Sequence, residues 1–481
     1  MACGSWPRGN ERVDRKFNYL VVSDLHLRGG YHDRTEGLYH FDEEFADFLR
    51  YYRLNRASTR PWQLVIAGDF IEFLYVTDLP DTGDPLLPRA TFSEEERRYG
   101  PSTEAPKARW KLDTILRNSH PQLLLALARF VAEGNHVVIL RGNHDAEMFW
   151  PEVQAHFLRL IAEHHPADVG YLAMKETVAQ RVRFAPWFWY VPDLFYVEHG
   201  CQYDAFCGFE YFLNPVLPAQ PAYIERAISD LAARYFAGPM NLLDSMAVEN
   251  IQSIGEYVAW VVRDNLSILP RTFRCYGQMA RRILAKSGKP DPEAERAVRA
   301  AQEREQAAVE ESFGLRSGTA AALQALHVTP VMRSVGATAR FLGLDLFAGG
   351  GALVAIALLL VLAHPVSVGW LPLVGVAAAL CAFVYIGALR IRRMIDAGQL
   401  RHVAEQVADL FQVPYVLFGH SHRAGIWRLH NGGTYFNIGT WIPSPTDAYF
   451  VYFALTGDGP EDSAGLWRWN KSKERPEPFE Q

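Results

Sequence analysis

Short apolar runs that stop at polar residues recur along the chain. Three lie in its N-terminal part, at 18–27, 62–70 and 136–145, and another lies near the C-terminus, at 413–422. An aromatic run at 188–200 has the same character. Runs of this length, rich in β-branched and aromatic residues, are typical of buried strands. The polar residues that follow each run predict functional loops at the strand ends.

Segments with helical spacing lie between these runs. The segments 41–54 and 121–134 place apolar residues on one face, and the second stops at a glycine. Further helices are expected at 223–236, 292–313 and 399–411, and the segment 292–313 is charged on most faces and expected to be solvated. The alternation of strands and helices predicts a layered α/β domain.

The region 346–389 contains no Asp, Glu, Lys or Arg. A membrane-spanning helix needs about 20 apolar residues, and the sequence HPVSVGW at 364–370 divides the region into candidate spans at 346–363 and 370–389. We therefore expect a two-span transmembrane hairpin, with a re-entrant hairpin and a buried core hairpin as alternatives. Arginines flank both outer ends and are missing from the connector. The positive-inside rule then predicts a multi-pass protein of the cell membrane with its other domains in the cytoplasm.

Composition excludes several classes of protein. The chain has 481 residues, of which 49% are hydrophobic and 21% charged, as in ordinary globular proteins with about two to four domains. A net charge of −6 argues against general nucleic-acid binding, which relies on excess Lys and Arg. The five cysteines form no C-x-x-C pair, which argues against a disulfide framework and a thiolate zinc site. The polar N-terminus lacks the apolar core of a secretory signal.

Short polar motifs follow the apolar runs. In α/β folds, ligands bind just beyond the carboxyl ends of strands, so we expect these motifs to meet in space. Their oxygen and imidazole donors suit Mn, Fe, Zn or Mg, and they predict a metal site. The motifs are Asp24-Leu25-His26, Gly68-Asp69 with Glu72, Gly142-Asn143-His144-Asp145, His199-Gly200 and Gly419-His420-Ser421-His422.

In this order, the sequences SDLHL, GDFIE, GNHD, HG and GHSH resemble the five blocks of the calcineurin-like metallophosphoesterase superfamily. The resemblance covers roughly 17–210 and 395–455. It implies a four-layer α/β/β/α sandwich with two divalent metal ions at one edge. It also implies a metal-dependent hydrolase of phosphoric esters or pyrophosphates. Manganese is the expected metal, and iron, zinc and magnesium are the alternatives.

The resemblance implies a role for each motif residue. His144 would stabilise the developing charge and protonate the leaving oxygen, and Glu72 would orient it. Because Glu72 is one methylene longer than the aspartate of many relatives, its reach stays open at this point. Asp145 is a candidate support for the ligand loop. The metal ligands form two sets that share a bridging Asp69: Asp24, His26, Asp69 and His422 for the first metal, and Asp69, Asn143, His199 and His420 for the second.

Candidate substrate contacts lie beside the ligand motifs. Arg28 and Arg141 adjoin two of the ligand loops, and a phosphate contact competes there with a surface salt bridge. Gln202, Tyr203 and Asp204 follow His199-Gly200 and are expected to line the same pocket.

The domain organisation follows from the motifs and the charge-free region. We expect a helical insert or cap between the two parts of the core, with a protein partner that the sequence leaves unknown. The expected units are an N-terminal tail at 1–16, core segments at 17–210 and 390–455, the insert at 211–345, the hairpin at 346–389 and a C-terminal tail at 456–481.

The resemblance extends to one branch of the superfamily. SDLHL, GDFIEF, GHSHRA and the following YFNIGTW look like the branch that contains UDP-2,3-diacylglucosamine diphosphatase. That branch carries arginine where this chain has His144, so the nucleotide-linked lipid is a candidate substrate only. The main hypothesis is a membrane-anchored hydrolase that cleaves a phosphodiester or pyrophosphate bond, with membrane lipid as a partner.

Two alternatives remain open. The first is a phosphodiesterase or phosphomonoesterase that acts on a soluble substrate. The second is a membrane scaffold with a vestigial metal site.

Overall fold

A computed structural model describes most of the chain. The described residues are 16–29, 41–55, 59–81, 83–87, 92–239, 269–345, 375, 397–442, 449–456 and 463–480.

The larger of two main sheets has seven strands in the order β14-β13-β12-β1-β2-β3-β4. Strands β1 to β4 are parallel, and β12 pairs antiparallel with β1. Leu20 and Val22 of β1 face the helices, whereas Tyr19 and Val21 face the second sheet. Burial of both faces explains the unbroken apolar run in the sequence. The strands are β1 (Asn18–Val22), β2 (Trp62–Ala67), β3 (His136–Leu140), β4 (Val182–Ala185), β12 (Tyr449–Thr456), β13 (Ser463–Asn470) and β14 (Arg475–Pro478).

The second sheet has five strands in the order β10-β11-β9-β6-β5. Its central strands β6, β9 and β11 are parallel, and the two outer strands are antiparallel to their neighbours. The strands are β5 (Phe188–Val191), β6 (Phe195–Glu198), β9 (Tyr415–Phe418), β10 (Gly425–Arg428) and β11 (Thr434–Asn437).

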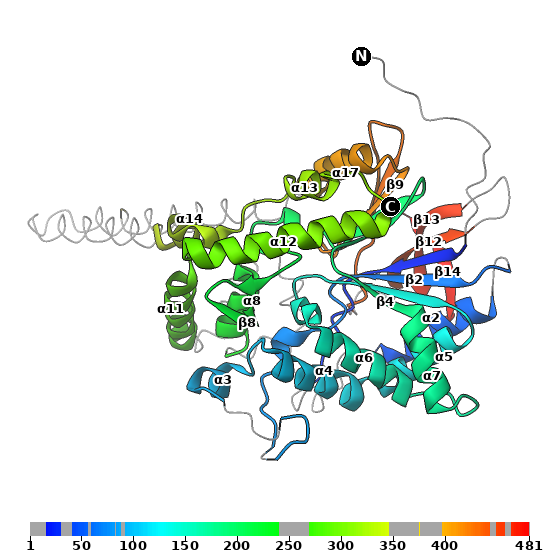
Figure 1. Cartoon of the computed structure of the whole chain (residues 1–481), viewed down its shortest axis with the longest axis horizontal. Helices are drawn as coiled ribbons and strands as arrows, with labels where there is room; N and C mark the ends of the chain where they lie inside the picture. The colour runs from blue at the N-terminus through cyan, green and yellow to red at the C-terminus, as the bar shows by residue number, and fades with distance from the viewer. Residues whose placement is uncertain are drawn as a thin grey trace, which may run out of the picture.

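The two sheets pack face to face between layers of helices (Figure 1). Tyr19 of β1 meets Phe195 of β6 with ring centroids 4.8 Å apart, and Phe436 meets Phe453 at 5.0 Å. One set of helices covers the outer face of the seven-stranded sheet. It comprises α2 (Asp42–Leu54), α4 (Ala105–Ser119), α5 (Pro121–Ala132), α6 (Pro151–Glu163) and α7 (Tyr171–Arg181). The outer face of the five-stranded sheet is covered by α17 (Ala397–Phe411) and α13 (Thr319–Gln324). The α/β layers expected from the sequence are therefore present.

Further short elements surround this sandwich. Three 3-10 turns, η1 (Phe73–Tyr75), η2 (Ala146–Phe149) and η3 (Cys201–Tyr203), follow ligand loops, and α3 (Glu94–Tyr99) precedes α4. The insert contains β7 (Val216–Leu217), β8 (Gln220–Ile224), α8 (Ile228–Ala232), the π-helical turn η4 (Ala233–Ala237), α11 (Leu269–Lys286), α12 (Pro292–Phe313), the 3-10 turn η6 (Val331–Arg333) and α14 (Val335–Phe341).

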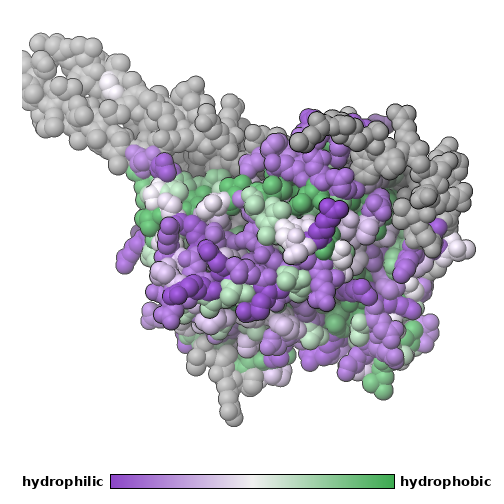
Figure 2. All heavy atoms as spheres, turned by 45° about the horizontal axis from the view of Figure 1, so that its top comes forward, coloured by the Kyte–Doolittle hydropathy of each residue, from purple (hydrophilic) through white to green (hydrophobic). Residues whose placement is uncertain are grey.

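The charged helix α12 has the predicted bounds, but one face of it packs against the core. Val298 and Val309 are buried, and Gln302 Oε1 accepts hydrogen bonds from the backbone N–H groups of Leu213 and Asn214 at 2.9 and 3.1 Å. Phe313 stacks on Phe188 of β5 at 5.3 Å. On the face of the molecule in Figure 2, hydrophilic side chains predominate and smaller hydrophobic areas lie among them. The helix is thus only partly solvated, because two valines and two glutamines are buried on its inner face.

A buried ion cluster ties the insert to the core. Glu147 Oε1 accepts from Lys111 Nζ at 2.7 Å and from Arg226 Nη2 at 2.8 Å, and the side chains of Lys111 and Glu147 are almost fully buried. Arg226 lies two residues before α8. Since loss of one member leaves an uncompensated buried charge, the cluster fixes where α8 lies on the core.

The C-terminal segment differs from the expected loose tail. Strands β13 and β14 extend the seven-stranded sheet, and Trp469 of β13 is fully buried. Strand β14 contains two prolines, which an edge strand tolerates because one side of it makes no ladder hydrogen bonds.

The membrane prediction requires correction. Within the described part of the chain, no helix is long and apolar enough to cross a membrane. Apart from residue 375, the predicted hairpin at 346–389 lies outside the described residues. The two-span hairpin was inferred from a long charge-free apolar region divided by a connector with Pro and Gly, and no described helix bears it out. We therefore withdraw it from the fold, together with the multi-pass localisation in the cell membrane and the cytoplasmic placement that rested on it.

Candidate metal centre

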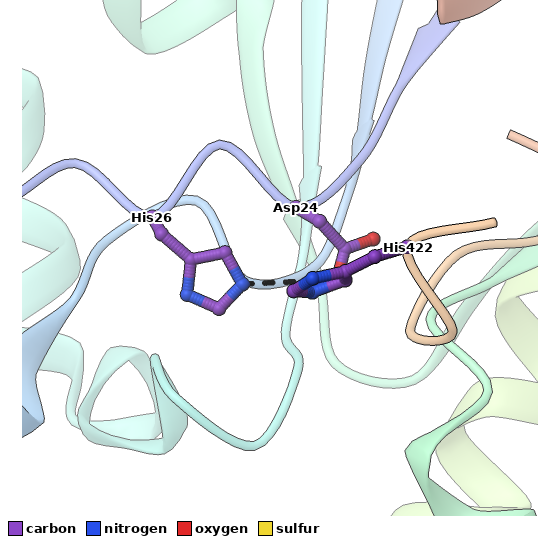
Figure 3. Close-up of side chains that lie close together, drawn as sticks. All are labelled: Asp24, His26 and His422. Carbon is purple, nitrogen blue, oxygen red and sulfur yellow. Dashed lines mark ion pairs between the residues drawn. The ribbon is translucent and has the colours of Figure 1, made fainter. Parts of the chain in front are cut away.

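The predicted ligand loops converge at one edge of the sandwich. Asp24, Asp69 and Asn143 follow the parallel strands β1, β2 and β3, whereas His199 and His420 follow β6 and β9 of the other sheet. Figure 3 shows Asp24 and His26 on the loop after β1, pointing toward His422 on the loop after β9. Segments far apart in the sequence thus meet at the carboxyl ends of the central strands.

The backbone of these loops is strained. Asp24, His26, Asp69, His420 and His422 have φ angles of 53°, 47°, 49°, 66° and 57°. The left-handed region is unfavourable for residues other than glycine. Non-glycine residues that adopt it cluster at functional sites. The strain indicates that the surrounding fold holds these side chains in fixed positions.

A glycine permits a close approach of two loops in the centre. A Cβ atom added at Gly142 would lie 2.1 Å from Asp69 Oδ1. Any side chain there would displace the carboxylate at the middle of the cluster, which explains the glycine of the GNHD motif.

One half of the centre contains Asp24, His26, Asp69 and His422. His422 Nε2 lies 3.1 Å from Asp24 Oδ1. His26 Nε2 lies 3.8 Å from Asp24 Oδ1 and 3.7 Å from Asp69 Oδ2. The two separations of His26 are too long for good hydrogen bonds but suit atoms that share one cation.

The other half contains Asp69, Asn143, His199 and His420. His199 Nδ1 donates to Ala67 O at 3.0 Å, which leaves Nε2 to face Asp69 Oδ2 at 3.1 Å. The backbone N–H of His144 donates to Asp69 Oδ1 at 2.9 Å. The rings of His199 and His420 pack edge to face with centroids 5.2 Å apart. Asp69 therefore faces both halves of the centre.

Four buried polar atoms in the centre have no hydrogen-bond partner among the described residues: Asp24 Oδ1, His26 Nε2, Asn143 Oδ1 and His199 Nε2. Buried polar groups are normally paired, so each such atom needs an explanation. Oxygen and imidazole nitrogen atoms are ligands for borderline and hard divalent cations. The donor set therefore fits the two ions expected from the sequence. The groups Asp24–His26–His422 and Asp24–Asp69–His199 are each compact enough to hold an ion.

Glu72 reaches two histidines with one oxygen. Its Oε2 lies 2.6 Å from His144 Nδ1 and 2.9 Å from His26 Nδ1. Its other oxygen accepts from the backbone N–H of Leu74 at 3.1 Å. The extra methylene of glutamate thus does not prevent the contact with His144. The sequence did not reveal the contact with His26.

The carboxylates of the centre hold protons on its histidines. Burial lowers the pKa of His26, but the nearby carboxylates of Asp24 and Glu72 outweigh it and raise that pKa to about 10. Burial also lowers the pKa of His199, and the charges of Asp69 and Asp24 raise it to about 9. Burial raises the pKa of Glu72, whereas His144 and His26 bring it down to about 2. Both His26 and His199 are therefore protonated at neutral pH in the metal-free chain.

Metal binding should release these protons. A cation must displace the protons of His26 and His199, so we expect Mn²⁺ affinity to rise with pH between 6.5 and 8.5, by about tenfold per unit for each proton released. Calorimetric titration of the metal-free protein in two buffers of different ionisation enthalpy measures the Mn²⁺ affinity and the number of protons released. Equal affinity at the two pH values, with no proton release, would contradict this electrostatic account.

Asp145 supports the ligand loops from behind. Its carboxylate accepts from the backbone N–H groups of Gly142 at 2.6 Å and Phe70 at 2.9 Å. It thereby connects the loop after β2 to the loop after β3, as expected of a support.

The candidate substrate contacts lie in less open positions than expected. The Arg141 guanidinium is buried, donates to the carbonyl oxygens of Pro186 and Phe212, and lies over the Phe212 ring. Arg28 lies over the Tyr75 ring, with its Cζ 4.4 Å from the ring centroid.

Gln202 and Tyr203 are buried as well. Gln202 exchanges hydrogen bonds with the backbone of Phe209, with its Nε2 donating at 3.2 Å and its Oε1 accepting at 3.1 Å. Tyr203 packs against Phe418 with ring centroids 5.5 Å apart. Both side chains are held in the protein interior, and their substrate roles stay predictions.

Two acidic residues outside the predicted ligand set contact ligands of the centre. Asp204 Oδ2 lies 3.2 Å from His420 Nε2, and Asp230 Oδ1 lies 3.5 Å from Asn143 Nδ2. Asp204 follows a motif and was a candidate pocket residue. Asp230 lies within an ordinary amphipathic segment of the insert, where no local signal marks it.

Comparison with known proteins supports the resemblance to the superfamily but not the narrower resemblance to one branch. Residues 17–201 match the family model described as calcineurin-like phosphoesterase, which is less than half of the chain. No curated protein matches the chain. The match supports neither the narrower likeness to the UDP-2,3-diacylglucosamine branch nor a lipid-linked substrate. The family implies a metal-dependent phosphoester hydrolase and typically uses two metal ions. Residues 17–201 are thus similar to a calcineurin-like phosphoesterase domain.

Proposed function

We propose that the chain is a dinuclear, metal-dependent hydrolase that acts on a soluble phosphodiester or phosphomonoester. The observation that carries the proposal is a set of buried atoms without a hydrogen-bond partner among the described residues, on Asp24, His26, Asn143 and His199. Three of these residues, Asp24, His26 and His199, lie close to Asp69. A structural hydrogen-bond network would leave no such set of unpaired atoms.

When bound, two divalent ions supply positive charge for the oxygens of the phosphoryl group. The chain's own residues keep the ions in place. Asp69 is shared because its Oδ2 faces both His199 and His26. Neutral imidazoles and few carboxylates hold the ions without cancelling their charge.

His144 supplies the proton for the leaving oxygen. Its Nδ1 contacts Glu72 Oε2, so Nε2 is left for the substrate. Its side chain is 19% exposed, in contrast to the almost fully buried His26 side chain. Burial lowers the pKa of His144, but Glu72 and Asp69 raise it above its ordinary value. A partly exposed imidazole with a raised pKa beside the centre is suited to general acid catalysis.

A soluble phosphoester is the substrate class that the chain supports best. The family match extends to a phosphoester hydrolase and no further. The presence of histidine at position 144 suits diesterases and monoesterases alike.

Stripping and restoring the metal tests the proposal. The purified chain is dialysed against a chelator, and Mn²⁺, Fe²⁺, Zn²⁺ or Mg²⁺ is then added. Hydrolysis of bis-p-nitrophenyl phosphate and p-nitrophenyl phosphate is followed beside the bound metal per chain. We expect hydrolysis only after metal is restored, with two ions per chain, and the faster substrate separates diesterase from monoesterase. An unchanged rate in the stripped protein, or no hydrolysis with any of the four metals, would exclude the proposal. Failure to bind metal at all would favour the scaffold hypothesis.

A further inference from the structure

His420 is oriented by a carboxylate outside the ligand set. Its Nε2 lies 3.2 Å from Asp204 Oδ2, and a carboxylate oxygen can only accept, so Nε2 carries the hydrogen. Its backbone N–H donates to Asp24 Oδ2 at 3.0 Å, which fixes the position of the residue. Nδ1 is therefore the nitrogen left with a free lone pair for a metal.

Asn143 has the same arrangement. Its Nδ2 donates to Asp230 Oδ1 at 3.5 Å, while its Oδ1 is buried without a hydrogen-bond partner among the described residues. Ser229 Oγ donates to the same Asp230 oxygen at 3.0 Å, which holds that carboxylate in place. Asp230 is 1% exposed. The amide nitrogen is thus taken up by Asp230, and the oxygen, the atom that can bind a cation, is left without a hydrogen bond among the described residues.

The carboxylates that contact His420 and Asn143 come from a different part of the chain than the groups that hold the other ligands. His26 is held by Glu72 of the GDFIE motif, and His199 by the carbonyl oxygen of Ala67. Asp204 and Asp230 lie after β6, and Asp230 is in α8 of the insert, beyond the residues that match the family. The ion cluster of Arg226, Glu147 and Lys111 anchors α8 next to the centre.

We propose that Asp204 and Asp230 are positioning residues that select the metal-binding atoms of His420 and Asn143. They thereby set the affinity of the second metal position separately from the first. The proposal rests on the metal-ligand roles proposed above. Outer carboxylates of this kind typically change metal affinity by about 10–100-fold. Through Asp230, the insert would control how the core loads its second ion.

Calorimetric titration of the metal-free chain with Mn²⁺ resolves the two binding steps. We expect Asp204→Ala and Asp230→Ala each to weaken one step by about 10–100-fold and to leave the other within twofold. Asp204→Asn keeps an oxygen that accepts from Nε2–H, so it should recover part of the loss. Asp168→Ala, which removes an exposed carboxylate from another loop, should change neither step. Equal weakening of both steps, or no change in a variant with wild-type thermal unfolding, would overturn the proposal.

The tautomer of His420 gives a readout that needs no metal. In the ¹⁵N spectrum of the metal-free wild type, with His420→Gln used for assignment, we expect the neutral ring to carry its hydrogen on Nε2. Asp204→Ala should shift the population toward the other tautomer, and an unchanged population would refute the role of Asp204. If the wild type binds fewer than two ions, the proposed function fails, and the tautomer still decides whether Asp204 orients the ring.

Discussion

Asp69→Asn is expected to lower the rate of phosphoester hydrolysis by about a thousandfold or more, which corresponds to about 4 kcal/mol of transition-state stabilisation. The variant should also retain fewer than two metal ions per chain. Initial rates with bis-p-nitrophenyl phosphate at saturating Mn²⁺, measured beside metal content, test both expectations.

The size of the effect follows from the position of Asp69. Its Oδ2 lies 3.1 Å from His199 Nε2 and 3.7 Å from His26 Nε2, so one side chain serves both halves of the centre. The neighbouring histidines, led by His199, hold the pKa of Asp69 well below its ordinary range although burial opposes this. Asparagine has the same shape but no charge. The substitution therefore removes the shared anion and leaves the packing nearly unchanged.

The controls separate chemistry from folding. Asp168→Asn makes the same chemical change at an exposed position and should behave as the wild type. Thermal unfolding of Asp69→Asn reports on the fold, since His26 and His199 lose a buried counter-charge. Hydrolysis at the wild-type rate in a folded Asp69→Asn variant would rule out a bridging role for this carboxylate.

The sequence predicted where the loops with polar motifs begin, because the strands before them are buried on both faces. Leu20 and Tyr19 face opposite layers and are both buried, so β1 is an unbroken apolar run and the first polar residues after it stand out. The same holds for β2, which ends at Ala67, immediately before Gly68 and Asp69. Parallel strands bring such ends to one edge, so the apolar runs, the polar motifs that follow them and the family resemblance together indicated where a candidate centre would lie.

Contacts between distant segments were not predictable in this way. Asp230 meets Asn143 across 87 residues of sequence, and its own segment has no unusual spacing. The second partner of Glu72, His26, depends on the path of two loops past each other. Strand β14 was expected as part of a loose tail because its two prolines are unfavourable in most strands, yet they are tolerated at a sheet edge. The charge-free region led to a membrane prediction that no described helix supports.

His144→Ala is expected to lower kcat by about 10²–10⁴-fold while both metal ions are retained. His144 contacts the centre through Glu72 and through its own backbone N–H, which donates to Asp69. The substitution removes the imidazole and preserves that backbone contact. Metal content per chain and kcat, measured on the same preparation, distinguish this variant from Asp69→Asn.

The choice of leaving group isolates the proton that His144 supplies. p-Nitrophenolate leaves without protonation, whereas an alkoxide requires a proton, so the loss in His144→Ala should be larger for an alkyl phosphodiester than for bis-p-nitrophenyl phosphate. The contact of Glu72 with the same imidazole makes Glu72→Gln the matched variant. Without the carboxylate charge, which raises the pKa of His144, the acidic group should lose its proton at lower pH. The alkaline limb of the wild-type pH profile should therefore move to lower pH in Glu72→Gln and disappear in His144→Ala. An equal loss of rate for both leaving groups would assign His144 to binding of the phosphoryl oxygens instead, because charge stabilisation acts on the two esters alike.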